Sequence, residues 1–578
     1  TVLSKNGEDA IENVKLAGSN VTFGGGGTDA QAFKANSLAV ASDQSITVAS
    51  GQVNVTGAAG ISLSGKSITV DGTIKARQIN LKATENDATL NSGSALNATG
   101  EDATNAISIT ANNGNINANG SLTADSVSLA AGNDINSAAD ITASTITMDG
   151  GDGKAISATG ALNAAGGTIT LGHAPSDEPA KAGTKTVVIG PAAGANKAVQ
   201  AQTVNVHATD TIDLSRVTME TADSLNLASK EVSITDSTVT TGGSLTLNST
   251  EDVANPSVSI TGSTLAGTAI NATGKGISVG SSDLTATTGE IAVNSTGEND
   301  IAVTNTALKA EHATNGNISI NSGKAIQATG GSMTAGTDIS LAAVAAKGGE
   351  DSDAAYAIKA SANMTAGNDI GLTTTAGEVY SAGSLTATSG SITMDSADGS
   401  KISMTGDLAA ASGTVTLGHA DGEHKTGIVE INSGTTDKGI KATSLLVNAT
   451  EEIGIQSAAI DVNSALHLGS KKVSVASSNI ATDGALTLAS LNSAATITGS
   501  TLEGTSATVS GNGISVSDST ITAATGGIGV TSTGENDITI YRTVFNATNE
   551  TNGNIAIASE KAVQATGGEM SAGKDIVI

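Results

Sequence analysis

The chain has 578 residues but only three Phe, three Tyr and no Trp or Cys. Aromatic side chains supply much of the buried area of a thick core, so this composition excludes large globular cores and leaves a thin interior of Ile, Val, Leu and Ala. The formal charge of −28 argues against nucleic acid and anionic membranes as partners, because both require basic surfaces.

Extensive disorder is also disfavoured. Charged residues make up 14% of the chain and apolar residues 38%, whereas disordered chains are rich in charge and poor in β-branched residues. No apolar run approaches the 18 residues of a membrane span. The opening "TVLSKNGEDA" has neither the basic nor the apolar region of a signal peptide, which suggests a mature or excised form.

Short alternating segments dominate from residue 45 onward. Two apolar residues flank one polar residue in "SITV", "QVNV", "GISL", "SITV", "TIKA" and "QINL", at 45–48, 52–55, 60–63, 67–70, 73–76 and 78–81. This alternation predicts very short β-strands with one buried face. A strand of this length is stable only beside other strands.

The segments recur in threes about every 20 residues. Ile107, Val127 and Ile146 are 20 and 19 residues apart, and Leu122 and Ile141 are 19 apart. This period predicts a parallel β-solenoid, in which each coil of three strands stacks on the one before. Irregular gaps favour a right-handed coil, the usual hand of parallel crossovers. An antiparallel sandwich would need longer strands and hairpin signals and fits less well.

A longer repeat relates 146–341 to 392–578. "ITMDGGDGKAISATGALNAAGGTITLGHA" returns 246 residues later as "ITMDSADGSKISMTGDLAAASGTVTLGHA", and the offset falls to 237 by "TGENDIAV" and "TGENDITI". The residues missing from the second copy fall in two turn-like segments that contain Pro, so the strands keep their pattern. We therefore predict one continuous solenoid over 1–578. Because the repeat stops in mid-pattern, we expect that the natural polypeptide continues or that copies stack end to end.

The chain resembles the shaft of filamentous-haemagglutinin-type exoproteins of type V secretion. The resemblance is carried by "GSLTADSVSLAAGNDI", "GNINANGSLTA", "ATGALNAAGGTITLGHA" and "MTAGNDIGLTTTAGEVYSAGSLTATSGSITM" and covers nearly all of 30–578. It implies a secreted, surface-associated β-helical rod. The "NPNG"-like secretion signature, an "RGD" triplet and a C-terminal barrel are missing from this sequence.

Catalysis on such a solenoid would need clustered carboxylates. The best pairs are Asp149 with Asp152 and Asp395 with Asp398, but both lie in glycine-containing corners, where Asp commonly shapes a turn. We therefore predict no catalytic residue. His173 and His419 hold equivalent places in "LGHA" and are expected as solvent-facing corner residues.

No cofactor or metal site is predicted either. "GGGGTDAQAF" at 24–33 and "GGEDSDAAYAI" at 348–358 faintly resemble calcium-binding repeats, but no nonapeptide run follows. "GGGGTD" also lacks the "GK[ST]" of a phosphate loop. Outward residues are too mixed for the flat threonine lattice of an ice-binding face.

The sequence thus predicts a secreted bacterial surface adhesin or filament shaft without catalysis. Its expected partners are a host-cell, glycan or neighbouring-bacterium surface, contacted through irregular corners at 174–186, 247–257 and 345–356. One alternative is a subunit of a self-associating, end-to-end filament. An alternative of another class is a β-helical polysaccharide lyase or glycosidase.

Overall fold

The computed structural model describes residues 11–24, 32–100, 104–177, 180–190, 197–249, 256–349, 352–419 and 425–578. The chain divides into two compact units, Thr1–Lys275 and Gly276–Ile578, which are described separately. The described residues form strands, turns and bends, and none of them belongs to a helix that could cross a membrane. The continuity of the solenoid over 1–578 stays a prediction.

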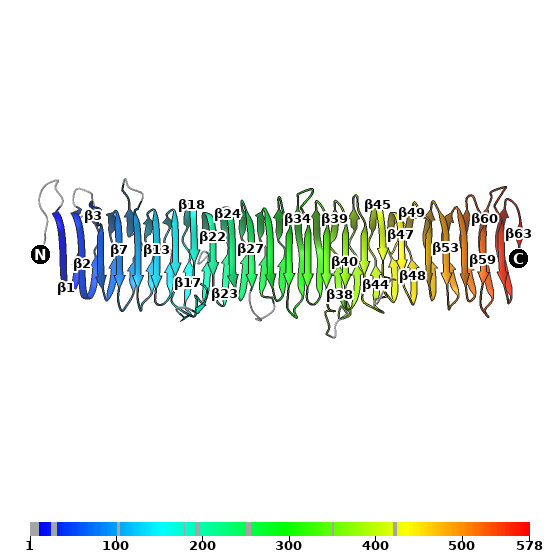
Figure 1. Ribbon diagram of the computed structural model, residues 1–578, viewed down its shortest axis with the longest axis horizontal. Helices are drawn as coiled ribbons and strands as arrows, with labels where there is room; N and C mark the ends of the chain where they lie inside the picture. The colour runs from blue at the N-terminus through cyan, green and yellow to red at the C-terminus, as the bar shows by residue number, and fades with distance from the viewer. Residues whose placement is uncertain are drawn as a thin grey trace. The chain divides into compact units, whose positions relative to one another are not determined.

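Unit 1 is a right-handed parallel β-solenoid in which each turn adds one strand to each of three ladders. Strands of successive turns lie side by side in Figure 1. A turn has about 22 residues, slightly more than the 20 predicted. Representative strands are β10 (Ala106–Ala111), β13 (Ser126–Ala131) and β16 (Thr145–Asp149) of the first ladder, β11 (Ile116–Ala118), β14 (Ile135–Ser137) and β17 (Ala155–Ala158) of the second, and β12 (Ser121–Thr123), β15 (Ile141–Thr142) and β18 (Leu162–Leu171) of the third.

The predicted register is confirmed. Val127 pairs with Ile107 in the preceding turn and Ile146 in the following one, and Ile116 pairs with Ile135. All five side chains are buried. Each inward position therefore forms an aliphatic ladder along the interior, while Ser and Asn between them face outward.

One local pairing departs from this parallel pattern. β19 (Ser176–Asp177) and β20 (Ala180–Lys181) form an antiparallel pair inside the predicted corner 174–186. The irregular corners are described only in part, because 178–179, 250–255 and 350–351 lie outside the described residues. Most of 24–33 lies outside them as well.

Unit 2 has the same architecture, and one of its ladders is important below. We call it the groove face. It contains β33 (Ile291–Ser295), β35 (Ile318–Ser322), β37 (Ile339–Ala343), β40 (Ile370–Thr374), β43 (Ile392–Asp395), β45 (Leu408–Leu417), β47 (Gly439–Asn448) and β50 (Leu466–Ser470). Ile318 pairs with Ile339 of the next turn, which in turn pairs with Ile370. The second pair is farther apart in the sequence, because the corner at 345–356 lengthens that turn.

Buried hydroxyl groups join successive corners of unit 2, a feature that sequence reasoning missed. The backbone N–H of Ala458 donates to the Oγ of Ser478 (3.2 Å), that of Ser478 to Ser500 (3.1 Å) and that of Ser500 to Ser519 (3.1 Å). Each hydroxyl in turn donates to the carbonyl oxygen two residues before it, at 2.7–2.8 Å. These bonds satisfy backbone donors that would otherwise be buried without a partner.

The residue before each of these serines turns the corner. Ser477, Gly499 and Asp518 have φ values of +49°, +58° and +51°. Gly, Asn and Asp are the residues that most readily adopt this left-handed conformation. In the sequence, such a corner is marked by a small or polar residue followed by Ser or Thr, directly before the next strand.

We predict that Ser500→Ala destabilises this corner by about 1–3 kcal/mol, because it leaves the buried Ser478 amide without an acceptor. The expected result is faster hydrogen exchange at the Ser478 amide and unfolding at a lower urea concentration. Ser474→Ala, on the outer side of β51 (Lys472–Ala476), is the control, with an expected change within about 0.5 kcal/mol. Equal exchange at Ser478 in both variants would contradict the proposed role of the hydroxyl.

Candidate functional site

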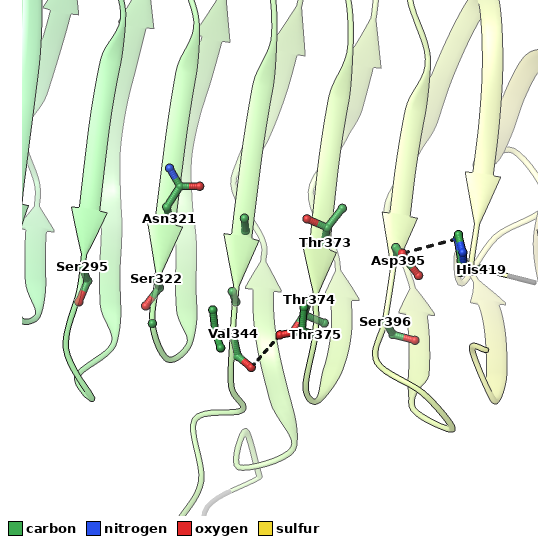
Figure 2. Close-up of a pocket in the computed structure, with 13 residues that line it drawn as sticks. Ser295, Asn321, Ser322, Val344, Thr373, Thr374, Thr375, Asp395, Ser396 and His419 are labelled. Carbon is green, nitrogen blue, oxygen red and sulfur yellow. Dashed lines mark hydrogen bonds and ion pairs between the residues drawn. The ribbon is translucent and has the colours of Figure 1, made fainter. Parts of the chain in front are cut away.

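An open groove of about 660 Å³ runs along the groove face of unit 2. The ends of consecutive strands line it, as Figure 2 shows. The lining residues are mainly small, hydroxyl or amide side chains: Ser295, Asn321, Ser322, Gly323, Ala342, Ala343, Val344, Thr373, Thr374, Thr375, Asp395, Ser396 and His419.

The groove follows directly from register. Asn321, Ala342, Thr373 and Asp395 pair in turn across four strands, so they occupy one outward row. Ala342 is the shortest side chain of that row and leaves a hollow between Asn321 and Thr373. Val344 is 55% exposed at its edge, where the Oγ1 of Thr375 donates to its carbonyl oxygen at 3.2 Å (Figure 2).

His419 lies at the end of this groove, close to Asp395. Its Nδ1 is 3.9 Å from the Asp395 carboxylate, and its side chain is 48% exposed. His419 also lines a second hollow of about 360 Å³, together with Lys425, Asn448 and His467. The two hollows therefore meet at His419 and together extend from β33 to β50.

The equivalent histidine of unit 1 has a different environment. One ring nitrogen of His173 bonds the carboxylate of Asp149, and the other lies 3.0 Å from Asp152. The backbone N–H of His173 donates to Thr184 at 3.2 Å, and its side chain is 19% exposed. With both ring nitrogens engaged, His173 fixes the corner and is not presented to a ligand.

The expectation of solvent-facing corner histidines therefore holds for His419 but not for His173. The two aspartate pairs also diverge. Asp152 contacts the histidine ring, whereas Asp398 accepts a hydrogen bond from the backbone N–H of Lys425 at 3.0 Å. Asp398 thus shapes its corner, as predicted. Within the described ranges, no group of three His, Cys, Asp or Glu has the arrangement of a metal site.

The glycine of each "LGHA" segment has a steric explanation. Gly172 and Gly418 have φ values of +74° and +83°. A Cβ at either position would lie 2.1 Å from a carbonyl oxygen of the next turn. The chain can therefore leave β18 or β45 close to its neighbour only with glycine there.

Comparison with known proteins gives little further information. No protein-family model and no curated protein matches the chain. A match among solved structures is an alginate lyase of family PL6, AlyGC, with 8% identity and a TM-score of 0.18 over 94% of this chain and 97% of that one. A TM-score this low carries no argument about fold or activity.

The predicted adhesin or filament-shaft function is corrected by these comparisons. They give no evidence for an adhesin, since no family model and no curated protein matches the chain. The resemblance in sequence style reflected the repeat architecture, which short Ile, Val and Leu packets produce whatever the function. The β-helical repeat architecture itself is confirmed.

We predict that diethyl pyrocarbonate modifies His419 faster than His173, because His419 is more exposed and has the weaker carboxylate contact. Peptide mass spectrometry after brief treatment at neutral pH measures both rates in one sample. Equal rates would show that the two corners do not differ in solution.

Proposed function

We propose that the chain is an extracellular, non-catalytic glycan-binding β-solenoid whose groove face takes an extended, neutral polysaccharide. The observation that carries this proposal is the groove itself. Hydroxyl and amide groups from successive turns, including those of Asn321, Thr373 and Ser396, line the groove, and small apolar side chains lie between them.

The geometry suits a linear polymer. Parallel strands repeat about every 4.8 Å, so successive turns present similar polar groups at regular intervals along the groove. Ligand sites typically combine an apolar lining with a few polar groups that set orientation. Here Ala342, Ala343 and Val344 provide the apolar part.

Charge favours a neutral glycan over an acidic one. The chain carries a formal charge of −28, which repels polyanions at long range. Asp395 and His419 are the ionisable side chains among the described residues that line the groove. Neutral sugars need hydrogen bonds rather than ion pairs, and the lining offers these.

The proposed extracellular location rests on the repeat architecture and the sequence resemblance. Neutral polysaccharides are abundant outside cells, where a slender repeat protein can present a long binding surface. The resemblance to filamentous-haemagglutinin-type shafts remains a proposal about architecture and secretion. Contact with a host or neighbouring bacterial surface, and end-to-end association, also remain predictions.

Polysaccharide cleavage is a second candidate, favoured by the position of His419 beside Asp395 in the groove. A histidine is a common general base, which a lyase needs to remove a proton next to the sugar carboxylate. Hydrolysis by the usual mechanism needs two carboxylates across the bond. Among the described lining residues, Asp395 supplies the single carboxylate, so elimination is the chemistry to test.

We predict that Ala342→Phe weakens binding of a neutral polysaccharide by at least about tenfold, equivalent to about 1.4 kcal/mol, because the ring fills the hollow. Ala481→Phe, at an outward position of β52 (Asn479–Thr482), is the matched control and should bind normally. Affinity electrophoresis against the neutral polymers xylan, galactomannan and β-glucan measures both, with alginate as the acidic comparison. Equal binding by the two variants would move the site away from the groove.

Turnover assays separate the two candidate functions. We expect neither the absorbance of a new C=C bond nor new reducing ends when the wild-type chain is incubated with the same polysaccharides. Product formation that is lost in His419→Ala would overturn the non-catalytic proposal and establish cleavage.

A further inference from the structure

Two of the three tyrosines in the chain meet on the outer surface of unit 2. Tyr356 begins β38 (Tyr356–Ala360), and Tyr380 lies in β41 (Glu378–Ser381). Their ring centroids are 5.4 Å apart, with a tilt of 40° between the planes. Both side chains are partly exposed. Elsewhere the outer strand positions carry mostly Ser, Thr, Asn and Ala, so this pair is chemically unusual.

A register shift places Tyr356 beside Tyr380. Ala357 and Ile358 are both buried, which breaks the alternation of β38 and leaves Tyr356 and Lys359 on the outside. Lys359 then pairs directly with Tyr380 in the next turn. Without this shift, Tyr356 would have the orientation of an inward residue, since neighbouring strand positions alternate between faces.

The surrounding contacts hold the two rings in place. The hydroxyl of Tyr380 lies 3.3 Å from that of Thr405 in the following turn. Lys359 donates to Asp353 at 2.7 Å, and the backbone N–H of Lys347 donates to the carbonyl of Tyr356 at 3.0 Å. Burial, with a contribution from the Glu378 carboxylate, raises the pKa of Tyr356. Its phenol stays protonated and can donate a hydrogen bond at neutral pH, as an ordinary tyrosine does.

The tyrosine pair is linked to the groove by one corner of the chain. The corner 345–356 leaves the groove face directly after Val344, which lines the groove, and ends at Tyr356. Val344 of the groove and Tyr356 of the pair thus lie at the two ends of this corner, after β37 and at the start of β38.

We propose that Tyr356 and Tyr380 form an aromatic platform on which a sugar ring of the same neutral polysaccharide stacks. A pyranose ring has an apolar face of C–H groups and a rim of hydroxyls. Tyrosine matches it with a rigid apolar ring and a polar tip, and it loses little conformational entropy on binding. The proposal rests on the glycan-binding function proposed above and adds a second contact to it.

Because the chain contains no tryptophan, its tyrosine fluorescence can report directly on binding at the tyrosine pair. The emission of this protein comes from its three tyrosines, two of which form the platform. Titration with oligosaccharides of the polysaccharide retained by the wild-type chain should change tyrosine emission in step with binding. Tyr380→Ala should weaken binding about tenfold, as expected for a central aromatic contact, and remove most of the emission change.

Two further variants serve as controls. Tyr541→Ala removes the third tyrosine, which lies in β60 (Ile538–Ala547) beneath the Arg542 guanidinium, and should bind normally. Tyr380→Phe keeps the ring and should retain most of the affinity. Circular dichroism of each variant verifies the fold.

The outcomes separate this proposal from the function on which it rests. Binding that Ala342→Phe weakens but Tyr380→Ala does not, with unchanged tyrosine emission, would overturn the platform and leave the groove intact. Failure of the wild-type chain to bind any of the polysaccharides would overturn both. Equal loss in Tyr380→Ala and Tyr380→Phe would show that the hydroxyl, rather than stacking, makes the contact.

Discussion

Parallel pairing between successive turns is the constraint on which this structure depends. Most of the described strands have two to six residues and cannot hold themselves together. Each gains stability from the turn before and the turn after it. Pairing fixes the register, and register decides which side chains face inward. A shift by one residue would turn each Ile and Val outward and bring Ser, Thr and Asn into the interior.

The corners carry the remaining specificity. The inward aliphatic residues can replace one another along the solenoid, since Ile, Val and Leu side chains fill similar space. The buried serines cannot, because Ser478, Ser500 and Ser519 each accept from a defined backbone amide in the neighbouring turn. A corner can still lengthen while parallel pairing resumes after it. Between β37 and β38 the longer corner is followed by a register shift confined to Tyr356–Ile358. Variable corners on a uniform frame are where a solenoid acquires binding surfaces.

Sequence duplication did not produce duplicate sites. β18 and β45 share the same pattern of buried and exposed residues, and each is followed by Gly and His. In unit 1 two carboxylates hold the imidazole, whereas in unit 2 the histidine is half-exposed at the end of a groove. The difference arises in the corners. Gly150 and Gly151 precede Asp152, which contacts the ring, whereas Ser396 and Ala397 precede Asp398, which accepts from the backbone N–H of Lys425.

The sequence by itself determined the class of fold, the approximate length of a turn and the inward residues, because short alternating segments report directly on a buried face. It also predicted no catalysis by clustered carboxylates, which stays a prediction. Only the tertiary structure decided which outward residues become neighbours. Tyr356 and Tyr380 are 24 positions apart, and their contact depends on the length of one corner and on one register shift. Likewise, the groove at Ala342 exists because four strands align small and polar side chains in a row. Such contacts join residues of different turns. The number of residues per turn varies too much along this chain for the sequence alone to show which residues become neighbours.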